Sequence, residues 1–307
     1  EDATVFIEAG YEIYKSYNNK RGMAYALNDL AGVIFVTGDY RESEAIFAEA
    51  YGLHKEMGDR NGIAHSISAL GNNATVNGDY EKARQCYRES LKIRRDLGDK
   101  RGIADSLQDL ARSELNTGNI DVAKRHIDDA IKMREEIGDR VGAAEALAGR
   151  AIGLVSLGAV DDVLPDIERV LELGKELDSG FLHIQGQAAY GEYLYQKGNY
   201  EESLGYFLEV LDKGNNSNVP VITMLALSGI AGILIKFGQV ERALSLATVV
   251  QRFPQGFLPL AQIRAEEVVK DAEKLLSKEQ LSTISSESQM LVPQKLINGI
   301  LTEFAGT

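Results

Sequence analysis

Apolar residues recur along this chain with the spacing of helices, in segments that end at a glycine followed by a polar residue. Residues 62–77 carry apolar or small groups three or four positions apart, and residues 80–97 repeat that pattern. Between them stand Gly78 and Asp79. Glycine adopts the left-handed conformation just past a helix, and aspartate caps the free N–H groups of the helix that follows. The pattern therefore predicts helices joined by short turns.

These turns recur with a constant period, which predicts a repeat array. The glycines that mark them are 40 residues apart, at Gly38, Gly78, Gly118, Gly158, Gly198 and Gly238. Short turns between helices produce antiparallel hairpins, here called helix A and helix B of each repeat. One hairpin cannot bury its own apolar face, so neighbouring hairpins must stack. The sequence thus predicts an all-α array of antiparallel helix hairpins.

Equivalent positions in the repeats indicate where the two helices of a hairpin meet. One helix A position holds only small residues: Ala31, Gly71, Ala111, Ala151, Gly191 and Ala231. One helix B position holds mostly large apolar residues: Phe47, Tyr87, Ile127, Ile167, Phe207 and Ala247. Small residues allow two helix axes to approach closely, so we expect a close approach of two helices at this position of the repeat.

The period divides the chain into three parts. Residues 1–20 match a helix B without its helix A, residues 21–258 hold six hairpins, and residues 259–307 form C-terminal capping helices, expected at 260–276 and 291–304. The half repeat leads us to expect a piece of a longer chain. A turn is expected at Gly214–Asn218, where the usual Gly-Asp turn is replaced.

Composition narrows the function classes. The net charge of −13 and the pI of about 4.9 disfavour direct nucleic-acid binding. Cys86 is the only cysteine, so no disulfide forms within the chain, as in a reducing compartment. No apolar run reaches the roughly 18 residues that span a bilayer. The four histidines lack metal spacing, and no phosphate-binding loop occurs. We expect a cytoplasmic protein without membrane contact, cofactor or metal.

The repeat resembles the tetratricopeptide repeat (TPR), through Leu70-Gly71, Gly78-Asp79-Tyr80, Ala83, Tyr87 and Ser90. The period is 40 rather than the usual 34, no tryptophan is present, and the fourth repeat reads Gly158-Ala159-Val160. The resemblance implies a right-handed superhelical solenoid. The phrases Gly58–Ala64 and Gly98–Ala104 are similar to the C-terminal TPR regions of STAND-type signalling ATPases and LuxR/MalT-like regulators.

This resemblance implies a ligand surface on the concave face, formed by helix A. Its candidate residues are Tyr25, Asn28, His65, Asn72, Asp105, Gln108, Arg112, Glu145, Gln185, Glu192 and Tyr195. Amides and charged groups can hold an extended peptide backbone, so the expected partner is a peptide or protein segment. Apolar residues in repeats four to six would extend this groove, or the C-terminal helices would cover them. Arg94 and Arg95, on helix B, are expected on the solvated outer face.

Several functions remain open at this point. The first is a sensing or autoinhibitory module that also contacts N-terminal domains of a larger regulator, and the second is a constitutive adaptor without switching. An enzyme is disfavoured because Asp105 and Glu145, the best paired carboxylates, lack an adjacent base. Self-association through the half repeat at residues 3–17 is the fourth possibility.

Overall fold

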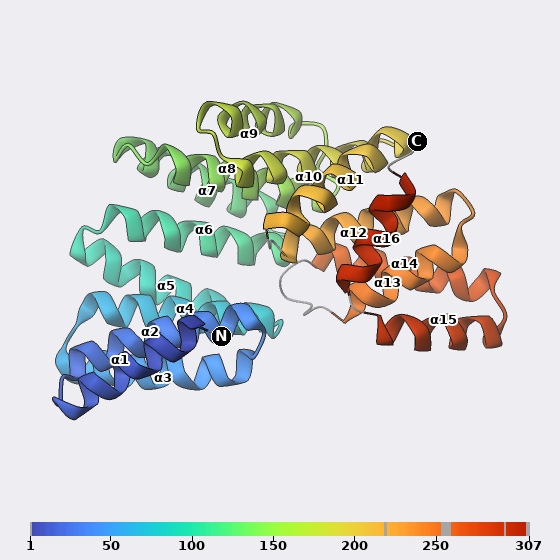
Figure 1. Cartoon of the computed structure of the whole chain (residues 1–307). Coiled ribbons are helices and arrows are strands. Elements are labelled where there is room, and N and C mark those ends of the chain that lie inside the picture. Colours follow the sequence, from blue (N-terminus) through green and yellow to red (C-terminus); the bar gives the residue numbers. More distant parts are fainter. Residues whose placement is uncertain (1, 218–219, 253–258, 292, 305–307) are drawn as a thin grey trace. The chain divides into compact units, whose positions relative to one another are not determined.

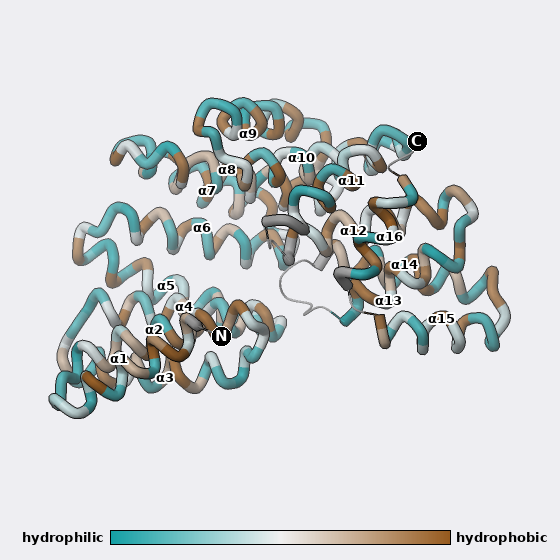
Figure 2. The backbone as a smooth tube through the Cα atoms, viewed as in Figure 1, coloured by the Kyte–Doolittle hydropathy of each residue, from teal (hydrophilic) through white to brown (hydrophobic). Residues whose placement is uncertain are grey.

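The computed structural model describes residues 2–217, 220–252, 259–291 and 293–304, and within these ranges it is built from sixteen α-helices without a strand (Figure 1). The all-α prediction is confirmed. The chain forms two compact units, residues 1–140 and 141–307, each of which is described by itself. Figure 2 shows how hydrophobic and hydrophilic residues alternate along the helices.

Unit 1 is a series of helices in which each packs against the next, from α1 through α7. Their bounds are α1 Asp2–Ser16, α2 Lys20–Thr37, α3 Tyr40–Met57, α4 Arg60–Val76, α5 Tyr80–Leu97, α6 Lys100–Asn116 and α7 Ile120–Glu136. The helices end where the glycine pattern predicts. Gly98 has φ +69°, and the side chain of Asp99 accepts the Gly102 N–H at 3.0 Å. One Gly-Asp pair thus ends α5 and caps α6.

The close approach expected within a hairpin is present between α4 and α5. Tyr87 is fully buried, and a Cβ placed on Gly71 would lie 2.6 Å from its ring carbon Cε1. The Tyr87 hydroxyl donates to Oδ1 of Asn72 at 2.9 Å and lies 3.0 Å from Oγ1 of Thr75. Glycine at position 71 therefore makes room for the tyrosine ring that fills this hairpin.

Unit 2 continues the hairpins and adds three C-terminal helices. Its bounds are α8 Arg140–Ser156, α9 Leu164–Glu176, α10 Gly180–Gln196, α11 Tyr200–Ser217, α12 Pro220–Lys236, α13 Val240–Gln251, α14 Pro259–Leu275, α15 Lys278–Met290 and α16 Pro293–Phe304. Helix α11 runs through Ser217, so the expected turn at Gly214–Asn218 is wrong for residues 214–217, while Asn218 lies outside the described residues. Helix α15 was not expected, and a capping box between Ser277 and Gln280 begins it.

The core of unit 2 surrounds α12. Residues 222–234 of this helix are buried on every side, as expected for a helix without a polar face. Helix α14 packs against α12 and α13, α15 packs against α13, and α16 packs against α11. The C-terminal helices therefore cover the end of the array. Among the helices in the described ranges, none is long and apolar enough to cross a membrane.

The space beside two glycines of unit 1 gives a stability prediction. We expect Gly71→Ala to lower the free energy of unfolding by about 1–2 kcal/mol, because overpacking against Tyr87 outweighs the better helix propensity of alanine. A Cβ on Gly32, in α2, meets no atom within 4 Å. Gly32→Ala is the matched control and should raise the free energy by about 0.5–1 kcal/mol. Urea unfolding measures both, and equal effects of the two substitutions would contradict the explanation.

Candidate functional site

A cavity of about 700 Å³ opens in unit 1 between α1, α2, α3 and α4. Three of the predicted ligand residues, Asn28, His65 and Asn72, line it. The other lining residues are mostly apolar, with one acid: Ile7, Asp29, Gly32, Val33, Phe35, Val36, Thr37, Phe47 and Ala69. A concave, largely apolar surface with a few polar groups is the usual form of a ligand site.

A second cavity, of about 420 Å³, lies between α1 and α2. It is lined by Tyr25, another predicted ligand residue, and by Asp29, which borders both cavities. Asp29 is exposed and makes no hydrogen bond or ion pair with any described residue. Asp29 is not among the predicted ligand residues, because the repeat pattern places it next to the ligand-facing position of Asn28.

Asn28 itself is buried in a polar network rather than exposed. Its Nδ2 lies 3.1 Å from His54 Nε2, and its Oδ1 accepts the Ser66 hydroxyl at 3.0 Å. On the other side of the ring, His54 Nδ1 lies 3.0 Å from Asp59 Oδ2, which also accepts the Tyr25 hydroxyl at 3.1 Å. The ring satisfies both neighbours if Nδ1 donates to Asp59 and Nε2 accepts from Asn28. The network holds Tyr25, which lines the second cavity.

Asp59 is the charged member of this network. Burial alone would raise the pKa of its carboxyl, but the Gly62 N–H, the Tyr25 hydroxyl and His54 hold that pKa below its ordinary value. The side-chain oxygen Oδ1 also caps α4 by accepting the Gly62 N–H at 3.1 Å. Asp59 thus caps α4 and also positions Tyr25, a predicted ligand residue.

A second polar network joins α4, α5 and α6 at Asn72 and Arg112. Nη2 of Arg112 donates to Oδ1 of Asn72 at 2.7 Å and to Oδ1 of Asp109 at 2.8 Å. The other oxygen of Asp109 accepts the Ser68 hydroxyl at 3.0 Å. Arg112 is exposed and Asn72 half-buried, so both are accessible on the same surface.

A basic residue near the end of α3, α5 and α7 (His54, Arg94 and Arg134) contacts the adjoining helix A. Arg134 donates to Oδ1 of Asp105 at 2.6 Å and to Oε1 of Gln108 at 3.2 Å, which holds these two predicted ligand residues. Arg94, one period earlier, is buried and donates to the Gly102 carbonyl and the Ser106 hydroxyl. The expectation that Arg94 is solvated was wrong, whereas Arg95 is exposed. His54, Arg94 and Arg134 stand 40 residues apart, and this spacing was the feature of the sequence that indicates their common role.

In unit 2 the predicted surface is partly filled by the chain itself. Glu192 and Arg264 form a two-pronged ion pair, with Nη1 to Oε2 at 2.9 Å and Nη2 to Oε1 at 2.5 Å, and their side chains are 1% and 4% exposed. The guanidinium lies 4.1 Å from the ring centroid of Tyr195. Arg264 belongs to α14, so this helix covers two predicted ligand residues.

Two further candidates, Glu145 and Gln185, lie half-buried in α8 and α10 of unit 2. Glu145 and Asp105 fall in different units, so the paired-carboxylate possibility gains no support from either unit. Within the described part of the chain, no group of three His, Cys, Asp or Glu side chains is arranged to hold a metal ion. Burial raises the pKa of the half-buried Cys86 thiol, which makes it less reactive.

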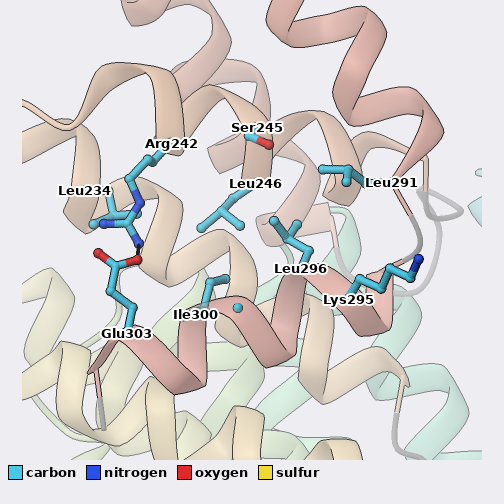
Figure 3. A pocket seen from close by; sticks show the side chains of 10 residues that line it. Leu234, Arg242, Ser245, Leu246, Leu291, Lys295, Leu296, Ile300 and Glu303 are labelled. Carbon is cyan, nitrogen blue, oxygen red and sulfur yellow. Dashed lines mark hydrogen bonds and ion pairs between the residues drawn. The ribbon is translucent and has the colours of Figure 1, made fainter. Parts of the chain in front are cut away.

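A third cavity, of about 320 Å³, lies where α16 packs on α12 and α13 (Figure 3). Leu246, Leu296 and Ile300 point toward one another in it, and Arg242 and Glu303 form an ion pair at one end. The residues expected to contact a ligand do not line this cavity. It is a partly open space within the C-terminal cover of unit 2.

Comparison with known proteins identifies the repeat. The tetratricopeptide repeat family model matches residues 22–96 and 64–136. Residues 22–136 are tetratricopeptide repeats. No curated protein sequence matches the chain significantly.

Solved structures with a similar fold align with nearly the whole chain. NprR in complex with its cognate peptide NprX is 11% identical, with a TM-score of 0.64 over 100% of this chain and 99% of that one. A Rap protein complexed with competence and sporulation factor is 13% identical, with a TM-score of 0.56 over 98% and 97%. The STAND protein PH0952 from Pyrococcus horikoshii, with a TPR sensor, is 15% identical, with a TM-score of 0.57 over 97% and 47%. At these identities the likeness shows the fold alone.

The charged state of Asp59 gives a pH prediction for the TPR segment. Because its folded pKa is depressed, its contribution to stability is present above the unfolded value near pH 4 and is lost as pH falls through the folded pKa. Asp59→Asn keeps an oxygen for the cap but removes the charge. We expect the variant to be less stable than the parent at pH 7, with the difference shrinking by pH 3. Urea unfolding at several pH values measures this, and a constant difference would contradict it.

The buried pair of Glu192 and Arg264 gives a stability prediction for unit 2. Arg264→Met leaves a buried unpaired carboxylate, which should cost about 3–5 kcal/mol, whereas the double variant Glu192→Leu with Arg264→Met should be about as stable as the parent. Lys274→Met removes the exposed pair with Asp271 on the same helix and should cost less than about 1 kcal/mol. Denaturant unfolding distinguishes these cases. A double variant as unstable as Arg264→Met would refute the account.

Proposed function

We propose that this TPR array is a protein-interaction scaffold that binds an extended peptide or protein segment on helices α2, α4 and α6 of unit 1. The cavity that combines an apolar wall with His65, Asn72 and Asp29 is the main support for this proposal. Amides and an imidazole can hydrogen-bond a peptide backbone, while the apolar wall receives a side chain.

The contacts of the structure narrow the proposed surface. Asn28 and Glu192 are buried and engaged with other side chains, so we propose no direct ligand contact for them. Tyr195 packs against Arg264, which leaves little of it for a ligand. The accessible candidates in unit 1 are Tyr25, His65, Asn72 and Arg112, with Asp105 and Gln108 half-buried beside them.

We further propose that the array is the sensing or autoinhibitory module of a larger signalling or transcription regulator, in which it also contacts N-terminal domains. Two of the structures similar to this chain, NprR and Rap, were solved with a bound peptide or factor, and a third contains a TPR sensor in a STAND protein. A ligand that binds one conformation of the array better than another would shift the population toward it. Catalysis is not part of the proposal.

Binding of a random peptide library to this chain tests the scaffold function. The double variant Asn72→Ala with Arg112→Ala removes the polar groups of α4 and α6 and should weaken binding at least about tenfold, or about 1.4 kcal/mol. The matched control is Lys92→Ala with Arg95→Ala, because both residues are exposed on α5. It should bind like the parent. Circular dichroism verifies that each variant is folded.

The outcomes separate the alternatives. Equal binding by the parent and the Asn72 and Arg112 variant would move the ligand site away from these helices. Failure of every peptide to bind would refute peptide binding by this chain. Binding without any change in hydrogen exchange outside the site would favour the constitutive adaptor over the switching module.

A further inference from the structure

The cavity between α2 and α4 contains the carboxylate of Asp29. The equivalent carboxylate in a later repeat, that of Asp109, binds a guanidinium. Asp29 and Gly32 stand two periods before Asp109 and Arg112 (109 − 29 = 80, and 112 − 32 = 80). In the later repeat, Arg112 Nη2 lies 2.8 Å from Asp109 Oδ1. In the first repeat the arginine is replaced by glycine, and the carboxylate of Asp29 has no ion-pair partner in the described chain.

The missing side chain leaves room beside Asp29. Asp29 and Gly32 line the same 700 Å³ cavity, and a Cβ on Gly32 would meet no atom within 4 Å. A glycine inside a helix costs stability relative to alanine, and no close packing of the kind seen at Gly71 requires one here. The space that Arg112 occupies in repeat three is therefore open in repeat one.

An aromatic ring lines this space as well. Phe35 borders the cavity and stands four periods before Tyr195 (195 − 35 = 160). The ring of Tyr195 lies 4.1 Å from the guanidinium of Arg264, which also pairs with Glu192. Unit 2 thus contains an arginine held by a carboxylate and an aromatic ring on helix α10. The cavity of unit 1 also has a carboxylate and an aromatic ring, but Asp29 stands one helical turn before Gly32, which is the position equivalent to Glu192.

We propose that this cavity is the specificity site of the scaffold and takes an arginine side chain of the bound peptide, with Asp29 as its ion-pair partner and Phe35 as its aromatic contact. The proposal rests on the peptide-binding function proposed above. Arginine fits better than lysine because its planar guanidinium pairs with a carboxylate and stacks on a ring at the same time. Partial enclosure by apolar walls strengthens the charge interaction relative to open water.

The test uses two sets of short peptides with blocked ends, identical except that one carries arginine where the other carries the uncharged isostere citrulline. We expect the parent chain to bind the arginine set at least about tenfold more tightly, as measured by fluorescence anisotropy. Asp29→Asn should reduce this preference to near unity. Glu49→Gln, which removes an exposed acid from α3 without touching the cavity, is the matched charge control and should retain the preference.

A second variant keeps Asp29 and supplies the arginine internally. Gly32→Arg restores the Asp-x-x-Arg pattern of repeat three and should abolish the preference for arginine peptides without loss of stability, while Gly32→Ala should retain it. Equal binding of both peptide sets by the parent, or loss of the preference in Glu49→Gln, would overturn the arginine site and leave peptide binding intact. Absence of binding by either set would overturn both proposals.

Discussion

A helical hairpin has more apolar surface than its own two helices can cover, and this constraint organises both units. In unit 1, α2 to α7 cover one another in sequence, with Tyr87 filling the space that Gly71 leaves. In unit 2, α12 is apolar on all sides and needs covering by α10, α11, α13 and α14. The chain meets that need with its own C-terminal helices. The predicted ligand residues of α10 are consequently covered by α14, whereas those of α2 and α4 line a cavity in unit 1.

Every repeat has a helix A, but the residue type at one position of this helix differs from repeat to repeat. The helix A position of Asn72 is occupied in successive repeats by Gly32, Asn72, Arg112, Ile152, Glu192 and Gly232. Asn72 and Arg112, neighbours in this series, contact each other across one period. Between Glu192 and α14 stands Gly232, where a Cβ would lie 2.9 Å from Cδ of Arg264. Glycine at position 232 leaves room for the side chain of Arg264 to cross α12 and reach Glu192.

The sequence was sufficient for the parts of the fold that depend on local chemistry. Gly98 and Asp99 mark a helix end and a cap because a left-handed residue and a short acid are needed there whatever the surroundings. Helix α15 was missed because its serines carry little apolar periodicity, although the capping box at Ser277 was a readable signal. Of the three C-terminal helices, α15 is therefore the one that the structure was needed to find.

The candidate site was less predictable because burial there depends on distant partners. Asn28 and Glu192 occupy ligand-facing positions of the repeat, yet both are buried by residues 26 and 72 positions away, His54 and Arg264. No local pattern contains that information. Asp29 was overlooked for the opposite reason: its importance comes from a partner that its own repeat lacks, and this becomes visible only when Asp109 and Arg112 are seen in contact.

The two arginines on the inner face also differ in what their contacts do. Arg264 and Glu192 are both buried, and apolar residues would serve packing equally well, so their pair is better explained as fixing where α14 lies against α10. Burial alone would lower the pKa of Arg264, but the charge and hydrogen bonds of Glu192 raise it above the ordinary value. Arg112 is half exposed, so its bonds to Asp109 and Asn72 hold the Asn72 amide in place but contribute little to stability. Arg264 is therefore held in a buried pair in unit 2, whereas Arg112 makes solvent-exposed contacts in unit 1.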